Sequence, residues 1–156
     1  MGSTGATGTS AEQVGWSEKD EKLAKEAIAM LEKGVGLARQ YQDAPKTFSN
    51  TKNLVTTIKG NIPAKESLVA KLAKSKVAEL SATRSLLQKS LPIDRDTQYP
   101  ITTRTSLFRR IMDRVVSEGP AQEAMIKKLN QALKDSDKAK AEAEKKKAQE
   151  KSESSS

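Results

Sequence analysis

The segment TRTSLFRRIMDRVVS, at residues 103–117, has the strongest amphipathic pattern in this chain of 156 residues. Its apolar side chains recur at spacings of three and four residues, which is the period of one face of an α-helix. They are Leu107, Phe108, Ile111, Met112, Val115 and Val116. The segment therefore predicts a helix with one face in an apolar core and the other in solvent.

Similar stripes on both sides of this segment predict further helices, and no stretch has the alternation typical of a strand. Helices are expected at about 17–43, 49–59, 63–91, 103–117 and 120–133. Gly60-Asn61 should stop the second of these helices. Because the links between helices are short, neighbouring helices are expected to run antiparallel.

Five prolines mark the expected boundaries of these helices. They are Pro45, Pro63, Pro92, Pro100 and Pro120. Proline lacks the amide N–H and clashes with the preceding turn, so each is expected between helices or in a first turn. Residues 92–102 then form the one long internal loop, where Asp94 and Asp96 are expected to cap turns beside Arg95.

The first expected helix has a recognisable N-cap pattern, and it also contains two glycines. Ser17 and Asp20 have the spacing of a capping box, with Asp where Glu or Gln is usual, and Trp16 precedes the cap. Gly34 and Gly36 lie inside the helix, where each costs about 1 kcal/mol relative to Ala. We expect them either to weaken the helix or to admit a neighbouring helix at close range.

The pattern as a whole predicts an all-α fold, a bundle of four to five helices over residues 16–133. Residues 1–15 have no periodicity and predict a disordered tail. Residues 134–156 keep helix-forming Ala, Lys and Glu but no large apolar side chain, which predicts a charged helical extension with a Ser-rich end. The small core makes a homodimer a further expectation, because a second copy would bury surplus apolar surface.

The residue types exclude most catalytic and metal sites. The chain has no cysteine and no histidine, so it lacks the thiolate nucleophile and the commonest general base and metal ligand. Neither glycine-rich phosphate-loop pattern occurs. We expect a binding protein rather than an enzyme, with no catalytic residues, metal or cofactor. No signal peptide or membrane span is recognisable, which favours an intracellular location, cytoplasmic or nuclear.

Arginine is concentrated in one region of a chain with a formal net charge of +8. Five of the seven arginines lie between residues 95 and 114, and a guanidinium binds phosphate or carboxylate in a bidentate manner. With two lysines of the preceding helix, the candidate anion-binding residues are Arg95, Arg104, Arg109, Arg110, Arg114, Lys71 and Lys74. The alternative is that these charges are solvated or paired with neighbouring carboxylates such as Asp113, Glu118 and Glu123.

Three kinds of partner fit this pattern. Nucleic acid is favoured, as a duplex bound with little sequence preference, because the chain offers charge with few aromatics for base stacking. An acidic protein, docked on amphipathic helices by an adaptor or assembly subunit, is the second. An anionic membrane is the third, helped by acylation of Gly2, although Ala6 stands where that motif requires Ser or Thr. Lys145–Lys147 is either a nucleic-acid arm or an ordinary solvated segment.

Overall fold

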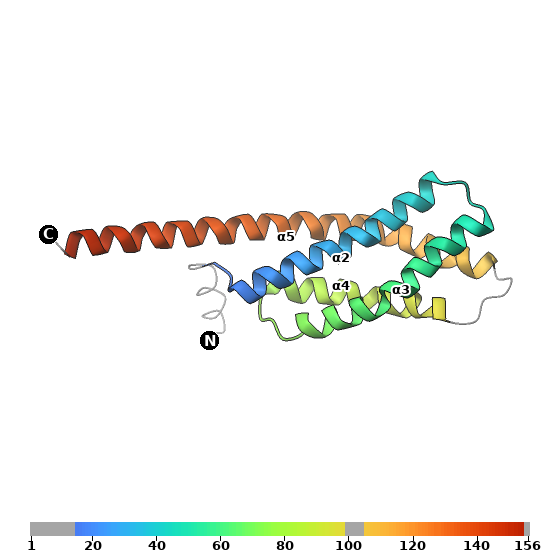
Figure 1. Cartoon of the computed structure of the whole chain (residues 1–156), viewed down its shortest axis with the longest axis horizontal. Helices are drawn as coiled ribbons and strands as arrows, with labels where there is room; N and C mark the ends of the chain where they lie inside the picture. The colour runs from blue at the N-terminus through green and yellow to red at the C-terminus, as the bar shows by residue number, and fades with distance from the viewer. Residues whose placement is uncertain (1–14, 99–104, 155–156) are drawn as a thin grey trace.

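In residues 15–98 and 105–154, which the computed structural model describes, the protein is a bundle of four long α-helices without strands (Figure 1). The helices are α2 (Glu18–Asp43), α3 (Phe48–Leu72), α4 (Ala78–Arg95) and α5 (Thr105–Ser154), with a short 3-10 helix, η1, at Asp96–Gln98. Consecutive helices run in opposite directions (Figure 1). The predicted all-α bundle is confirmed.

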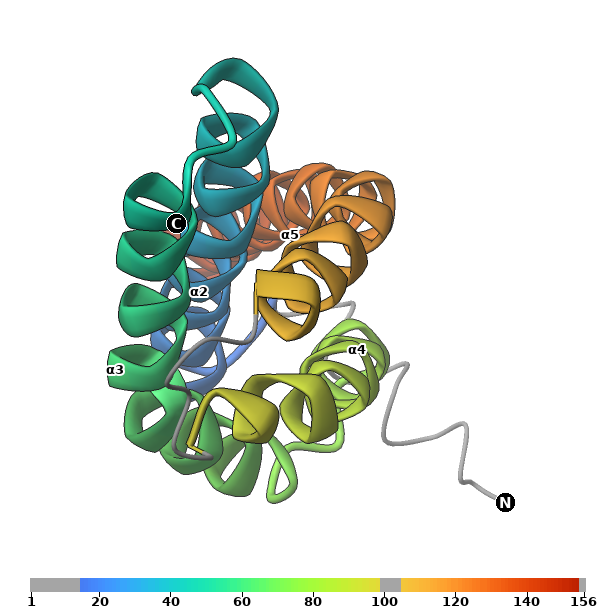
Figure 2. The ribbon, with the colours of Figure 1, turned by 90° about the vertical axis from the view of Figure 1, so that its right-hand side faces the viewer.

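The four helices form a ring when the bundle is viewed end-on (Figure 2). α2 lies between α3 and α5, and α4 closes the ring on the other side. The most extensive packing joins α2 to α5 and α3 to α4. Segments far apart in sequence therefore share one interior.

The start of α2 agrees with its sequence signal. Ser17 is the N-cap, and its hydroxyl accepts a hydrogen bond from the Asp20 amide at 3.1 Å. The half-buried Trp16 packs against the core beside the cap, and its amide donates to the Ser136 hydroxyl of α5 at 2.7 Å. α2 ends at Asp43, two residues before Pro45, as predicted.

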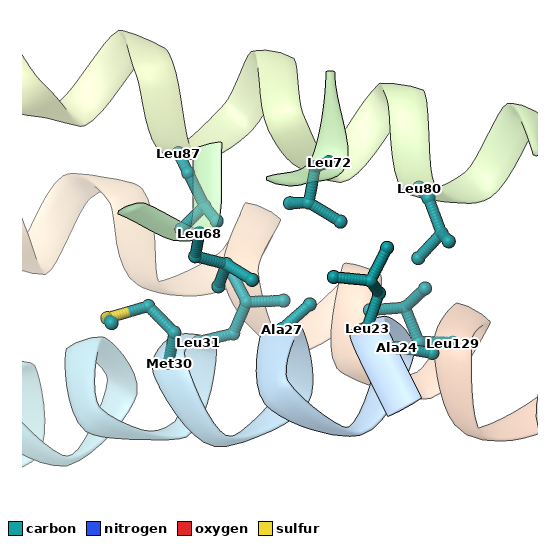
Figure 3. Packing of buried hydrophobic residues seen from close by; sticks show 10 residues of the cluster. All are labelled: Leu23, Ala24, Ala27, Met30, Leu31, Leu68, Leu72, Leu80, Leu87 and Leu129. Carbon is teal, nitrogen blue, oxygen red and sulfur yellow. The ribbon is translucent and has the colours of Figure 1, made fainter. Parts of the chain in front are cut away.

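Two apolar clusters lie along the length of the bundle. All four helices contribute to the first core, which consists of Leu23, Ala24, Ala27, Met30, Leu31, Leu68, Leu72, Leu80, Leu87 and Leu129. Figure 3 shows the leucines of α3 and α4 directed toward those of α2. The second core consists of Leu37, Ala38, Tyr41, Leu54, Val55, Ile58, Phe108, Ile111, Met112 and Val115. Burying each leucine or isoleucine contributes about 1.5–3 kcal/mol, so these clusters supply most of the driving force for folding.

The expected stop at Gly60-Asn61 and the helix start at Pro63 are wrong, because α3 runs through all three residues. Ile58 and Ile62 are both buried, so a break between them would remove one from the interior. Pro63 is exposed, and so is Lys59, whose carbonyl loses its helical partner. A solvent-facing carbonyl can bond water, which lowers the cost of the proline.

The predicted continuous helix over 63–91 is also wrong, since the chain turns between Leu72 and Ala78 without proline or glycine. The turn places Leu68 and Leu72 of α3, and Leu80 and Leu87 of α4, against the same stretch of α2. A straight helix could not bring both halves back to one core. Ser75 supports the turn, because its hydroxyl donates to Asp20 at 3.0 Å and accepts from the Val77 amide at 3.2 Å.

Pro92 and Pro120 do not separate helices either. α4 continues three residues past Pro92 to Arg95, and α5 continues through Pro120 to Ser154. Both prolines are exposed, and the buried positions of α5 keep their helical spacing on both sides of Pro120. The gain from packing one continuous stripe exceeds the loss of one backbone hydrogen bond. Pro100 lies outside the described residues.

The last part of α5 projects beyond the bundle (Figure 1). Large apolar side chains end at Leu133, but polar contacts with α2 continue as far as Lys140, whose ammonium pairs with Glu21 at 2.9 Å. We call residues 141–154 the arm, which spans about 21 Å at the α-helical rise of 1.5 Å per residue. Its described side chains are exposed apart from the half-buried Ala143.

Candidate anion-binding surfaces

The structure divides the seven predicted anion-binding residues between different parts of the bundle. Lys71 and Lys74 lie at the end of α3, next to Leu72 of the first core. Arg109, Arg110 and Arg114 lie near the start of α5, next to the second core. Arg95 ends α4, and Arg104 lies outside the described residues. The structure therefore does not bring these residues together on one surface.

The first candidate is the arginine surface, formed by Arg109, Arg110 and Arg114 on α5. All three are exposed, because Phe108, Ile111 and Val115 take the buried face of the same turns. Arg114 Nε lies 3.8 Å from Glu118 Oε2, which is a weak pairing. Arg109 and Arg110 have no carboxylate of the described residues within 4.0 Å.

The neighbourhood of Tyr41 locates Arg109 more closely. Burial raises the pKa of the Tyr41 hydroxyl, the Asp113 carboxylate raises it further, and the Arg109 guanidinium opposes the rise. Arg109 and Asp113 therefore lie on the α2 side of α5, one turn apart. Arg110 and Arg114 form the adjacent row, so the arginine surface is two short rows with Asp113 among them and Glu118 at the edge beside Arg114.

The second candidate is the lysine groove, which Lys19 and Lys22 of α2 form with Lys71 and Lys74. It has a volume of about 240 Å³, and Leu23 and Glu26 complete its lining. Lys71 Nζ lies 3.8 Å from Glu26 Oε1, and both side chains are well exposed. Four ammonium groups thus face one carboxylate, which makes the groove attractive to anions.

The sequence interpretation missed Lys19 and Lys22 because it missed the turn after α3. A helix running from 63 to 91 would carry Lys71 and Lys74 past the start of α2. The turn at residues 73–77 instead ends α3 beside the first turn of α2, where both lysines lie. The sequence does contain one indication of this pair, because Lys19 and Lys22 are three residues apart and therefore lie on the same face of a helix.

Arg95 belongs to neither surface, because it pairs across the bundle. Its Nη2 atom donates to Glu66 Oε2 of α3 at 3.0 Å. Both side chains are about half exposed, so the pair contributes no more than about 1 kcal/mol. The alternative anticipated for these arginines, pairing with nearby carboxylates, thus applies to Arg95 and weakly to Arg114.

A buried polar cluster occupies the space between the two cores, where the sequence predicted only a loop. We call Lys65, Ser90, Asp94, Glu118 and Gln122 the polar layer. Asp94 is 3% exposed and belongs to α4, so its expected role as a turn cap in a loop is wrong. Lys65 Nζ lies 2.5 Å from Asp94 Oδ2 and donates to the Ser90 hydroxyl at 2.9 Å.

The carboxyl groups of the polar layer respond to this burial. Burial raises the pKa of Asp94 above its ordinary value of 3.8, and the charge of Lys65 opposes that rise. Burial also raises the pKa of Glu118 above 4.5, and the nearby negative charge of Asp94 adds to the rise. Both carboxyls therefore interact with the Lys65 ammonium, while Arg95 lowers the pKa of Asp94 and Arg114 lowers that of Glu118 less than burial raises them.

Comparison with protein-family models, with characterised proteins and with solved structures gave no match for this chain. Within residues 15–98 and 105–154, no three acidic side chains gather closely enough to hold a metal ion. None of the helices described is both long and apolar enough to cross a membrane. Gly2, the predicted acylation site, lies outside the described residues.

Proposed function

We propose that this protein is a non-catalytic binding module whose two basic surfaces bind the phosphates of an extended polyanion, with duplex nucleic acid the favoured partner. The observation that carries the proposal is the placement of the two surfaces. The lysine groove lies at the start of α2, and the arginine surface lies on the turns of α5 whose buried side chains pack with Tyr41 near the end of α2. Between Lys22 and Tyr41 the helix rises about 29 Å, at 1.5 Å per residue.

This separation favours a long ligand over a small one. A single phosphate or nucleotide would reach one surface and leave the other unoccupied. Successive turns of a nucleic-acid duplex repeat about every 34–36 Å, so phosphates one turn apart have a comparable spacing. Lysine ammonium and arginine guanidinium groups contact such phosphates without reading base identity, which is why we propose little sequence preference.

The charge of the arm favours these two surfaces, and not the arm, as the sites of phosphate binding. The arm contains four lysines and four glutamates, so it carries no net charge. Lys145–Lys147 is flanked by Glu142, Glu144 and Glu150 at helical spacings of three and four. Such spacing favours intrahelical pairing and weakens the interpretation of this segment as a nucleic-acid arm.

The test is fluorescence anisotropy with a labelled duplex of about two turns, in DNA and RNA forms, over a range of salt concentrations. Wild-type affinity should fall linearly with the logarithm of the salt concentration. Arg109→Glu/Arg110→Glu and Lys71→Glu/Lys74→Glu should each lower the affinity roughly tenfold or more. Each should also reduce the salt slope by about 1 for every phosphate that the variant no longer binds.

The matched control is Lys145→Glu/Lys146→Glu in the arm, which makes the same charge change outside both surfaces. It should lower the affinity much less than either surface variant. Affinity that does not change with salt, or no binding to either duplex, would contradict the proposal. Equal losses in all three variants would instead point to net charge alone and would remove the two surfaces as sites.

A groove between α2 and α5 supports the adaptor as the second candidate function. It has a volume of about 460 Å³, with the apolar Val35, Gly36 and Ile126 in its lining between charged side chains of both helices. An apolar floor with mixed charges at its rim suits an amphipathic helix of a partner protein. A complex that survives moderate salt and is lost in Ile126→Glu would favour this function over nucleic acid.

A further inference from the structure

The polar layer divides the interior of the bundle into two apolar halves. On α5, Glu118 and Gln122 lie between Val115 of the second core and Leu129 of the first. On α2, Gly34 occupies the corresponding place between Leu31 and Leu37. Polar side chains in the middle of a bundle are costly unless each polar atom has a hydrogen-bond partner.

One polar atom of this layer has no partner in the protein. Gln122 is 5% exposed, and its Oε1 atom is buried without a hydrogen bond from any described group. A buried acceptor left in this state destabilises the folded protein. A ligand that donates a hydrogen bond to this atom would remove this destabilisation.

The space for such a ligand is present. A cavity of about 30 Å³ lies against Gln122, Glu118, Asp94, Lys65 and Asn61. A cavity needs at least about 10–15 Å³ to hold one water molecule, together with two to four polar partners. The volume therefore fits one or two water molecules and is too small for an organic ligand.

The groups around the cavity include both hydrogen-bond donors and hydrogen-bond acceptors for a water molecule. Lys65 and Lys33 both line the cavity, and Lys65 has three N–H donors, of which Ser90 and Asp94 engage two, so one is available. Glu118, whose carboxylate pairs only weakly with Arg114, offers acceptor oxygens. A water molecule there would accept from Lys65 and donate to Gln122 and Glu118.

The backbone of α2 is shaped to leave this space open. A Cβ atom at Gly34 would lie 2.5 Å from Gln122 Oε1 and 3.0 Å from its Cδ atom. A larger residue at this position would therefore displace the amide of Gln122 from its place in the layer. A metal ion is a poorer occupant than water, because the Lys65 ammonium already supplies the positive charge beside Asp94.

We propose that the cavity binds one ordered water molecule, which joins Gln122 of α5 to Lys65 of α3 and completes the hydrogen bonding of the polar layer. The water is a structural ligand of the bundle. It also hydrates Glu118, the second carboxyl of the polar layer. Because its partners come from different helices, it fixes the position of α5 along α3.

The direct test is a crystal structure at a resolution that shows ordered water, combined with NMR cross-relaxation between water and the Gln122 side-chain amide. The proposal expects one water within hydrogen-bond distance of Gln122 Oε1, with a residence time long enough to be detected. A wild-type cavity without ordered water, by both methods, would overturn it.

Thermal unfolding of Gln122→Met supplies the second measurement, because methionine keeps the shape and removes the acceptor. If water satisfies Gln122, the variant loses the water signal and its Tm falls by roughly 2–4 °C or more. If Oε1 is unsatisfied, removing it should raise the Tm instead, and that result would contradict the proposal. Gln88→Met, at an exposed position inside α4, controls for the change in helix propensity. Should Gln122→Met fail to fold, the wild-type structure and spectra still decide.

Discussion

Gly34 and Gly36 are two residues apart on α2, yet their surroundings differ. Gly34 faces the amide of Gln122, whereas no side chain or neighbouring helix lies within 4 Å of the place where a Cβ of Gly36 would be. Only one of the two alternatives stated from the sequence therefore applies to each. Gly34 admits a neighbouring helix at close range, and Gly36 simply weakens α2.

The same substitution should accordingly have opposite effects at these two positions. Gly36→Ala should stabilise the protein by about 0.5–1 kcal/mol, because alanine is the better helix former. Gly34→Ala should destabilise it by about 1 kcal/mol, since the overpacking cost of about 1–3 kcal/mol exceeds that gain. Urea denaturation measures both. Stabilisation by Gly34→Ala would show that the Gln122 amide moves aside freely.

The Lys65–Asp94 pair offers a similar contrast with the pair of Arg95 and Glu66. Lys65→Met leaves a buried carboxylate without its cation and should cost about 3–5 kcal/mol. Arg95→Met breaks an exposed pair and should cost less than about 1 kcal/mol. Lys65→Met/Asp94→Leu should recover most of the loss. Denaturation curves in which both single variants lose the same stability would contradict the buried character of the first pair.

The raised pKa of Glu118 makes stability depend on pH. A carboxyl whose pKa is higher in the folded state than in the unfolded one contributes stability at low pH, which is lost as pH rises through the folded value. Glu118→Gln removes this loss, so its free energy of unfolding relative to wild type should grow as pH rises from about 4.5 toward neutrality. Denaturation at several pH values measures it. Glu32→Gln, at an exposed position of α2 outside the ion pairs described, is the control. A difference between Glu118→Gln and wild type that is independent of pH would contradict the prediction.

At the scale of elements, sequence patterns predicted which segments are helical better than where helices end. The cap at Ser17 was predictable because its signal is local, a hydroxyl three residues before the amide it caps. The passage of α3 through Pro63 was not, because it depends on Ile58 and Ile62 meeting other helices. The turn at Ser75 contains neither proline nor glycine, so only the return of Leu80 to the first core reveals it.

The candidate site followed the same division. The exposure of Arg109 and Arg110 was predictable from the amphipathic stripe of their own helix. The lysine groove and the polar layer were not predictable, because each joins residues of different helices. The lysine groove depends on the turn at residues 73–77, and the polar layer depends on the burial of Asp94. Periodicity indicates which side of a helix is buried but does not identify the neighbouring helix.

The two parts of the C-terminal segment should differ in their effect on stability. A chain that ends at Lys140 keeps the hydrogen bonds and the ion pair that join Ser136 and Lys140 to Trp16 and Glu21. Its Tm should stay within about 1 °C of wild type, because residues 141–154 bury almost nothing. A chain that ends at Asp135 has none of these interactions, and its Tm should fall by about 2–4 °C for each kcal/mol of destabilisation. Calorimetry of both truncations is the measurement, and equal Tm values would contradict the prediction.

At the scale of the whole molecule, α5 sets the longest dimension. Its 50 residues span about 75 Å at 1.5 Å per residue. A compact chain of this length would have a radius of gyration of about 15 Å. Small-angle X-ray scattering should therefore give a clearly larger radius and a maximum dimension of at least about 75 Å.

Scattering from the chain that ends at Lys140 shows how much of the maximum dimension the arm contributes, as distinct from the N-terminal segment. Removing the arm should shorten the maximum dimension by roughly 21 Å, at the helical rise of 1.5 Å per residue. A wild-type radius near 15 Å, or a dimension unchanged by truncation, would show that the arm folds back on the bundle.

The contacts of Trp16 and Lys140 have a mechanical consequence. α2 begins at the end of the bundle from which the arm leaves, and the two helices are antiparallel neighbours (Figure 1). Tension between the start of α2 and the arm would separate α2 from α5 progressively, beginning at that end of the bundle. The hydrogen bond of Trp16 to Ser136 and the ion pair of Glu21 with Lys140 would bear the force first. The molecule should then yield turn by turn at low force, with the second core the last to open.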